Sequence, residues 1–158
     1  MTPHEMPDED LLRHIADQEA RIVFRDFSMA RALEVGQALV AKAQAANAPV
    51  VVDITRTGQV LFHCALEGAT PDNAQWVIRK NRVVDRFRHS SLYMGAFCRI
   101  AGVTLEQKYM LPANRYAAHG GAFPIIVEGA GVIGTVTVSG LPQIEDHELV
   151  VSVLSEFV

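Results

Sequence analysis

The sequence predicts an α+β fold in which helices cover a largely antiparallel sheet. Three observations favour it: apolar residues recur at helical spacing in several segments, β-branched runs come in adjacent pairs, and glycine-containing turns separate the members of each pair. The expected order is helix, strand, helix, two strands, helices, two or three strands and helix, which is unlike the strict alternation of a Rossmann unit. With 158 residues, 49% of them hydrophobic, the chain suits one compact domain with its own core.

The chain before Ser28 is expected to hold a short amphipathic helix over residues 7–20 and a strand in the segment "RIVFRDFS" that follows it. Ser28 has a hydroxyl that suits the N-cap of the next helix. We therefore expect an N-terminal helix and strand over residues 1–27 and the main domain over residues 28–158, within one compact unit overall.

A β-hairpin is expected in "VVVDITRTGQVLFHCAL", with its turn at Thr57-Gly58. Strand alternation places His63 on one face of this hairpin. Four apolar side chains fall on the opposite face: Val60, Phe62, Cys64 and Leu66. His63 is therefore expected either beneath a covering helix or at an interface.

The next helix carries a strong start signal, because Thr70 suits its N-cap, Pro71 its first position and Asp72 its first turn. It is expected to run to about residue 89. At helical spacing its apolar stripe comprises Trp76, Val83, Val84 and Phe87, and an arginine row on another face comprises Arg79, Arg82 and Arg86. We expect this row to be a solvated face or a subunit contact.

Lys80 falls inside the apolar stripe of that helix. A lysine in such a position extends to solvent, pairs with a carboxylate, or faces a cavity where its charge is used. The carboxylates considered for a pair are Asp146 and Glu128. All three interpretations stay open at the level of sequence.

A helix with small residues, "LYMGAFCRIAG", and a short turn capped by Thr104 are expected before Pro112. A strand is expected to begin near Arg115. "PIIVE" and "VIGTVTVS" then pair as a hairpin across "GAG", and "PQIEDHELVVSVLSEFV" forms the last helix. The "EDHE" run does not predict a metal site, because consecutive helical residues point about 100° apart and acids in a first turn complement the helix dipole.

The composition argues against two classes of partner. The net charge of −4 and a pI near 5.8 give no attraction to nucleic acid or to an anionic membrane, and the arginine row lacks stacking aromatics beside it. No segment approaches the roughly 20 apolar residues of a membrane span, and the first residues lack the apolar run of a signal peptide. We therefore expect a cytoplasmic protein that binds neither nucleic acid nor membrane, with Cys64 and Cys98 as reduced core thiols.

The segment His119-Gly120-Gly121 raises the question of a ligand loop. An esterase oxyanion loop of this kind accompanies a GxSxG nucleophile motif, and the chain has none. Its glycines do not form a GxxxxGK(S/T) phosphate loop either. His119 is the best candidate for a ligand contact among the histidines, because the glycines clear space beside it and Phe123 would supply an apolar wall; a hydrogen-bonded structural turn is the alternative.

The segments "HGGAFPIIVEG", "GVIGTVTVSG" and "LPQIEDHELV" resemble, in this order, the C-terminal half of the GlcG/HbpS-like family, which is also described as haem-degrading and is similar to the C-terminal domain of PduO-type proteins. The resemblance extends back to Met29, and the "HGGAFP" and "SGLPQIEDH" motifs are closest to an uncharacterised branch. It implies a profilin-like or PAS-like α-β-α arrangement and a homo-oligomer. Members are linked to haem, to corrinoids and to small-organic-acid metabolism, so haem or a corrinoid is the cofactor class it implies.

The expected ligand site combines the residues with the resemblance. The resemblance places a lysine at the position of Lys80, where it would meet an anionic ligand such as a propionate or a small carboxylic acid. The expected ligand-binding residues are Lys80, His119, Gly120, Gly121, Phe123 and Asp146. For haem iron, His119 is preferred to His63 as the ligand, and no other metal site is expected.

These observations favour an oligomeric protein that binds a small anionic or tetrapyrrole-like ligand near Lys80 and His119. The alternative is a multimeric assembly or partner-binding protein in which the same motifs only shape subunit contacts. An enzyme that acts on such a ligand is the third hypothesis. It is less favoured, because no nucleophile–base pair follows from the spacing of the residues.

Overall fold

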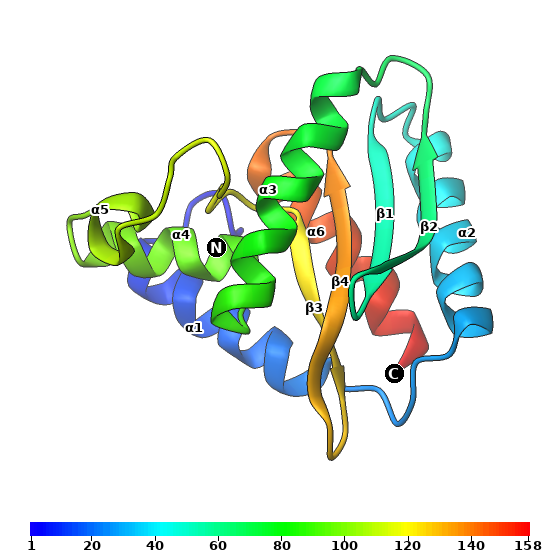
Figure 1. The fold of residues 1–158 in the computed structure, drawn as a ribbon, viewed down its shortest axis with the longest axis horizontal. Coiled ribbons are helices and arrows are strands. Elements are labelled where there is room, and N and C mark those ends of the chain that lie inside the picture. The colour runs from blue at the N-terminus through cyan, green and yellow to red at the C-terminus, as the bar shows by residue number, and fades with distance from the viewer.

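An antiparallel four-stranded sheet forms the middle layer of the fold, in the order β2-β1-β4-β3 (Figure 1). The computed structural model describes all of residues 1–158. The strands are β1 (Val51–Arg56), β2 (Gln59–Ala65), β3 (Ala122–Val127) and β4 (Gly131–Ser139). The two hairpins, β1-β2 and β3-β4, meet along β1 and β4, so strands far apart in the sequence form the centre of the sheet.

Helices cover both faces of this sheet, which confirms the expected α+β class and its α-β-α layering. Helices α2 (Met29–Ala45) and α6 (Gln143–Leu154) pack on one face, and α3 (Pro71–Phe87) lies along the other, in front of the strands in Figure 1. At one end of the molecule α1 (Asp8–Arg21) packs against α4 (Ser91–Ile100), with α5 (Leu105–Tyr109) beside them. A single 3-10 turn, Ser155–Phe157, ends the chain.

The main hydrophobic core lies between the sheet and the pair α2 and α6. Its fully buried members include Val35, Leu39, Ile54, Ile125, Val136, Val150 and Leu154. Each such side chain contributes about 1.5–3 kcal/mol by leaving water, so this layer supplies most of the apolar stabilisation. A smaller cluster, formed by Leu11, Ile15, Leu92 and Ala96, holds α1 against α4. None of the helices has the length and hydropathy that crossing a membrane requires.

Two predicted strands do not form as expected. The segment "RIVFRDFS" forms only one parallel bridge, between Phe24 and Val127 at the end of β3, and its buried residues Ile22, Phe24 and Phe27 pack into the main core. Phe24 and Phe27 instead pack edge to face, with ring centroids 5.0 Å apart. The strand expected near Arg115 begins only at Ala122, and a loop fills the interval.

The first hairpin forms as expected, with positive φ at both Thr57 and Gly58, but one side chain departs from the expected face. A bulge opposite Ile54 and Thr55 adds a residue to β2 and shifts the register of the strand. Val60 is therefore 59% exposed, whereas Phe62 packs against the core from the expected face.

The N-terminal helix is docked onto α6 by a buried polar contact. His147 of α6 is 2% exposed, and its Nε2–H donates to Oε1 of Gln18 at 2.7 Å. The amide nitrogen of Gln18 donates in turn to Nε2 of His14 at 3.1 Å. Burial lowers the pKa of His147 to about 3, with the charge of His14 acting in the same direction.

Lowering the pH is expected to destabilise the fold through His147. In the folded state His147 has a pKa of about 3, whereas in the unfolded chain its pKa is near 6.5. The unfolded state therefore binds a proton more readily, and the free energy of unfolding falls as the pH drops from about 6.5 toward about 3. From about pH 7.5 to about pH 5 this group alone should cost about 2 kcal/mol. Urea denaturation at both pH values measures the loss. His147→Gln keeps a hydrogen-bonding amide near Gln18 and has no titratable group, so this variant should show little of the loss of stability between the two pH values. An equal loss in the wild-type protein and the variant would contradict this account.

Candidate functional site

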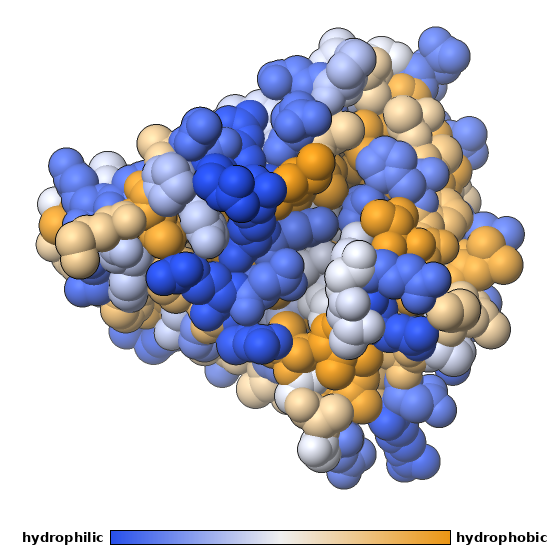
Figure 2. All heavy atoms as spheres, viewed as in Figure 1, coloured by the Kyte–Doolittle hydropathy of each residue, from blue (hydrophilic) through white to orange (hydrophobic).

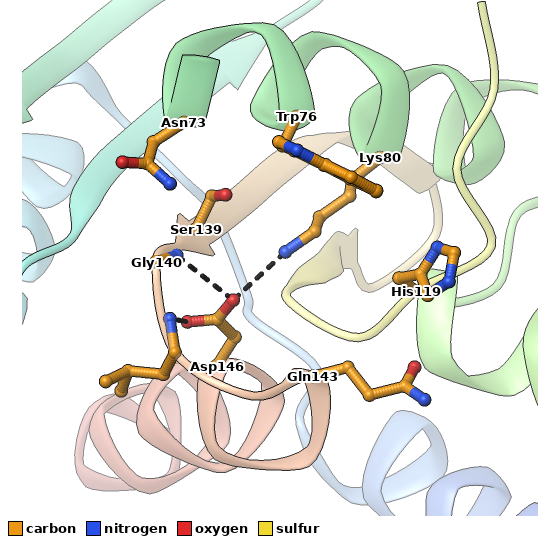
Figure 3. A pocket seen from close by; sticks show the side chains of 9 residues that line it. Asn73, Trp76, Lys80, His119, Ser139, Gly140, Gln143 and Asp146 are labelled. Carbon is orange, nitrogen blue, oxygen red and sulfur yellow. Dashed lines mark hydrogen bonds and ion pairs between the residues drawn. The ribbon is translucent and has the colours of Figure 1, made fainter. Parts of the chain in front are cut away.

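A cavity of about 250 Å³ opens between α3, the loop that precedes β3 and the start of α6 (Figure 3). Segments from three distant parts of the sequence meet there. The residues that line it are Asn73, Trp76, Lys80, His119, Ser139, Gly140, Leu141, Gln143 and Asp146. The structure thus brings together Lys80, His119 and Asp146, which the sequence analysis places in one site.

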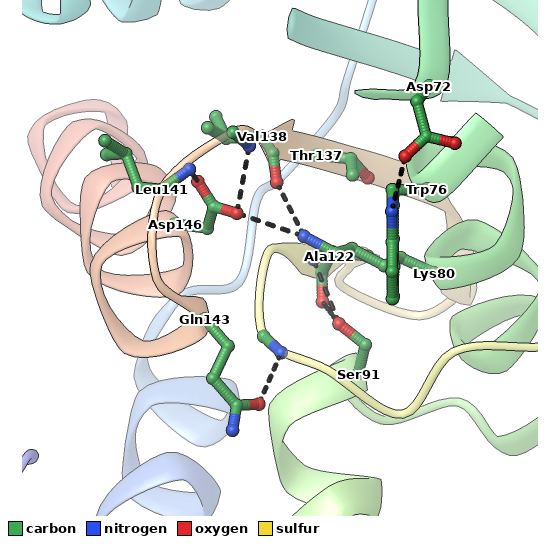
Figure 4. A network of polar contacts seen from close by, with 12 residues as sticks. Asp72, Trp76, Lys80, Ser91, Ala122, Thr137, Val138, Leu141, Gln143 and Asp146 are labelled. Carbon is green, nitrogen blue, oxygen red and sulfur yellow. Dashed lines mark hydrogen bonds and ion pairs between the residues drawn. The ribbon is translucent and has the colours of Figure 1, made fainter. Parts of the chain in front are cut away.

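The floor of this pocket is a buried ion pair. Nζ of Lys80 lies 3.1 Å from Oδ2 of Asp146, and the two residues are only 3% and 1% exposed. The ammonium also donates to the carbonyl oxygen of Val138 at 3.2 Å. The backbone N–H groups of Gly140 and Leu141 donate to the Asp146 carboxylate at 3.3 and 2.9 Å (Figure 4). Of the three interpretations of Lys80, extension to solvent is wrong and the pair with a carboxylate is what forms; the side chain also lines a cavity.

Burial disfavours the charged form of both Lys80 and Asp146. It lowers the pKa of Lys80, while the Asp146 charge pulls that pKa back up. It raises the pKa of Asp146, while the Lys80 charge and two backbone donors pull that pKa back down. Because both residues are almost fully buried, each charge is tolerated only through the polar partners that the other elements supply.

Trp76 forms a wall of the pocket instead of part of the core, which corrects the expected apolar stripe. Its indole Nε1–H donates to Oδ2 of Asp72 at 3.2 Å, which turns the ring outward from α3. The guanidinium of Arg79 stacks on the ring at 4.2 Å, and the imidazole of His119 meets it edge to face at 5.4 Å. Partial burial lowers the pKa of His119, and the nearby charge of Lys80 lowers it further. The imidazole is therefore neutral near neutral pH.

The two glycines of the His-Gly-Gly segment allow the loop to approach the floor of the pocket. A Cβ on Gly121 would lie 2.6 Å from Nζ of Lys80 and would collide with the carbonyl oxygen of Val138, and the φ of this glycine is +140°. A Cβ on Gly120 would collide with the carbonyl oxygen of Gln143. The segment is thus a tight turn that shapes the pocket.

Phe123 lies outside this site, contrary to expectation. His63, the less favoured candidate for a haem-iron ligand, lies outside it too. Phe123 is fully buried in the main core, where its ring faces that of His147 at 5.8 Å, so it supplies no wall for the pocket. His63 lies on β2, and its Nδ1 pairs with Oδ2 of Asp53 at 2.8 Å. No group of three or more His, Cys, Asp or Glu side chains converges as a metal site.

Three polar residues of the pocket were not anticipated from the sequence. Oδ1 of Asn73 accepts from the backbone N–H of Thr70 at 2.8 Å, and Oε1 of Gln143 accepts from that of Gly120 at 3.0 Å. The amide NH₂ groups of Asn73 and Gln143 and the hydroxyl of Ser139 donate to no protein acceptor. The capping position of Asn73, three residues after Thr70, is the one local signal that could have pointed to the first of them.

The arginine row on α3 holds the loop that carries His119. Nη1 of Arg82 donates to the carbonyl oxygen of Arg115 at 3.3 Å, and the guanidinium of Arg86 lies 6.0 Å from the ring centroid of Tyr116. Hydrophilic residues gather over this part of the molecule in Figure 2. The arginine row therefore stabilises this loop in addition to facing solvent.

Adding a methyl group at Gly121 is expected to be more costly than adding one at Gly129. Both glycines have positive φ, so both substitutions by alanine strain the backbone by about 1–2 kcal/mol. The Cβ of Gly121→Ala also meets Lys80 and Val138, whereas that of Gly129→Ala meets nothing within 4 Å. Urea denaturation should show at least about 2 kcal/mol of additional loss for Gly121→Ala. Equal losses would show that the loop does not constrain the floor of the pocket.

Comparison with known proteins places this chain in a family. A family model described as haem degrading protein HbpS-like matches residues 27–155. A UPF0303 protein of Streptomyces coelicolor is 48% identical over 152 residues, which cover 96% of both chains. A UPF0303 protein of Streptomyces avermitilis is 54% identical over 140 residues, covering 89% of this chain and 86% of its own.

Solved structures agree with this assignment. The crystal structure of Ybr137w protein has a TM-score of 0.85 and 34% identity, and the alignment covers 92% of this chain and 86% of that one. A structure described as a PduOC:heme complex has a TM-score of 0.67 at 18% identity, with 84% of this chain and 94% of that one covered, and shows the shared fold alone. Since the family model spans most of the sequence, the chain belongs to the HbpS-like family that this model describes.

Proposed function

We propose that the protein binds a small carboxylate-bearing molecule in the pocket above the Lys80–Asp146 pair. The observation that carries this proposal is the excess of hydrogen-bond donors around the cavity. Its only acidic residue, Asp146, already accepts from Lys80 and from two backbone N–H groups. The amide groups of Asn73 and Gln143 leave their donors to a ligand. A molecule that offers several acceptor oxygens therefore complements this site.

The electrostatics of the pocket favour an anion. An ammonium carries three N–H donors, and Lys80 uses two of them within the protein, toward Val138 and Asp146. Helix α6 begins at Gln143, so its positive dipole end lies at the rim. The neutral imidazole of His119 adds one more donor. Together these groups would offset the cost of removing a carboxylate from water.

The pocket fits the carboxylate of a tetrapyrrole better than its macrocycle. Only two of the nine lining residues are hydrophobic, Trp76 and Leu141, and the cavity holds about 250 Å³. A porphyrin or corrin ring needs apolar surface against its faces, which these residues do not provide. A haem-like or corrinoid-like ligand would therefore place a propionate or similar acidic side chain in the pocket, with its ring outside. The family description names haem, which keeps this ligand class within the proposal.

A homo-oligomer also remains part of the proposal. The edge strand β2 pairs with the sheet along one side only, and Val60 on it is 59% exposed. A second copy that covers this edge would satisfy the unpaired backbone groups. In the alternative function, such contacts would be the whole role of the protein and the pocket would stay without a ligand.

Small carboxylates are expected to change the fluorescence of Trp76, the only tryptophan in the chain. Acetate, lactate and succinate should give saturable changes in emission, whereas acetamide and lactamide should not, because they lack the negative charge. His119→Leu should raise the dissociation constant for lactate about tenfold, as expected for the loss of one hydrogen bond to a charged group. His63→Leu, which alters a histidine outside the pocket, is the matched control and should leave the constant unchanged.

Hemin and native mass spectrometry complete this test. Hemin that enters by a propionate should compete with lactate for the Trp76 signal, and His119→Ala should alter any Soret band more than His63→Ala does. Mass spectra of the same samples give the number of subunits and of bound ligands. A monomer whose Trp76 emission responds to neither carboxylates nor hemin would overturn the proposed function.

A further inference from the structure

We propose that Lys80 forms a reversible imine with a small carbonyl compound, which makes 2-oxo acids the ligand class of the pocket. This inference rests on the proposed function, because the carboxylate of the ligand must occupy the donor groups already described. It goes beyond that function by assigning a covalent step to one side chain.

Lys80 is set apart from the other amines of the chain by its position. The sequence contains three lysines, and the other two, Lys42 and Lys108, are exposed on helix surfaces. Of the three, only Lys80 lines the cavity, and Figure 3 shows its amine pointing away from α3 toward the carboxylate of Asp146. The missing side chain of Gly121 leaves room for Nζ to reach that place. A carbonyl compound that enters the pocket therefore meets one amine only.

Burial makes the neutral amine form of Lys80 easier to reach than that of an exposed lysine. A lysine attacks a carbonyl only in its neutral form, and desolvation is the usual way in which proteins reach that form. Burial lowers the pKa of Lys80 and raises that of Asp146. Oδ2 of Asp146, 3.1 Å from Nζ, is placed to take up the proton. A ligand that fills the mouth of the pocket removes the remaining water, which lowers the pKa of Lys80 further, whereas the ligand's own carboxylate charge acts in the opposite direction.

The step balances without an oxidant or a reductant. The lone pair of Nζ forms a bond to the carbonyl carbon, and the carbonyl oxygen takes a proton to give a carbinolamine. Loss of this oxygen as water forms the C=N bond, and both hydrogens of the amine leave with it. The neutral imidazole of His119, at the rim of the same pocket, is able to pass protons to and from the departing oxygen.

The hydrogen-bond donors that would hold the carboxylate determine which carbonyl compounds react with Lys80. Asn73 and Gln143 lie on opposite sides of the Lys80 amine in Figure 3 and come from α3 and α6. A 2-oxo acid joins its carboxylate directly to the carbonyl carbon, so a carboxylate held by these amides brings that carbon close to Nζ. An aldehyde without a carboxylate lacks this positioning, and a 2-hydroxy acid binds without reacting.

Reductive trapping tests the imine. The full-length protein is incubated with pyruvate and sodium cyanoborohydride, and peptide mass mapping locates the reduced adduct. The proposal predicts that the adduct on Lys80 forms at least about tenfold faster than on Lys42 or Lys108, and peptide mapping separates it from any adduct on the α-amino group of Met1. Lactate, which has no carbonyl group, should protect Lys80 without adding mass. Propionaldehyde, which has no carboxylate, should label the α-amino group of Met1 and the three lysines without a preference for Lys80.

Lys80→Arg is the matched variant, since it keeps a positive charge for Asp146 and removes the reactive amine. It should abolish the fast adduct, and its circular dichroism shows whether the fold is kept. A folded wild-type protein with pyruvate adducts spread over Lys42 and Lys108, or with none, would overturn the imine. If pyruvate and lactate still change the emission of Trp76 in that case, the proposed carboxylate site stands without the covalent step. If neither ligand changes it, both proposals fall together.

Discussion

The buried ion pair between Lys80 and Asp146 is the interaction on which the rest of the site depends. An isolated charge in a protein interior is strongly unfavourable, so each partner requires the other and requires further hydrogen bonds. Here α3 supplies the ammonium, β4 the carbonyl oxygen of Val138, and the first turn of α6 the carboxylate. The carboxylate in turn binds the N–H groups of the loop between β4 and α6. One pair thus fixes the helix on one face of the sheet relative to the helix on the other.

The pocket is a consequence of this arrangement. Because the pair sits at the junction of three elements, the loop that crosses above it has to approach very closely, and only Gly120 and Gly121 leave the space for that approach. The loop is held from the other side by backbone and side-chain groups of α3, including a hydrogen bond from the N–H of Ala117 to the carbonyl oxygen of Arg79. His119 is thereby kept at the rim against Trp76, and the polar ends of Asn73 and Gln143 complete a cavity that offers donors.

Local signals in the sequence were sufficient for most elements. Of the nine residues that line the pocket, three were predicted as site residues: Lys80, His119 and Asp146. The Thr70-Pro71 helix start, the Thr57-Gly58 turn and the hairpin across residues 128–131 were predicted because short-range geometry decides them. The partner of Lys80 was not decided, since Asp146 lies 66 residues away and only the tertiary fold selects it over Glu128. Phe123 was misplaced because the chain enters β3 at Ala122, and alternation then turns the ring to the opposite face of the sheet. Trp76 was misplaced because a hydrogen bond to Asp72, which helical spacing does not reveal, draws it outward.

A double-mutant cycle on the buried pair tests the central claim most directly. The free energies of unfolding of Lys80→Met, Asp146→Asn and the double variant are compared with that of the wild-type protein by urea denaturation. If the pair is the anchor described above, each single change leaves a buried charge without its partner and costs about 3–5 kcal/mol. The double variant removes both charges, so it should be more stable than the sum of the single losses predicts, by about 2 kcal/mol or more. Losses that add to within about 0.5 kcal/mol would contradict the account, because they would show that the two residues act independently.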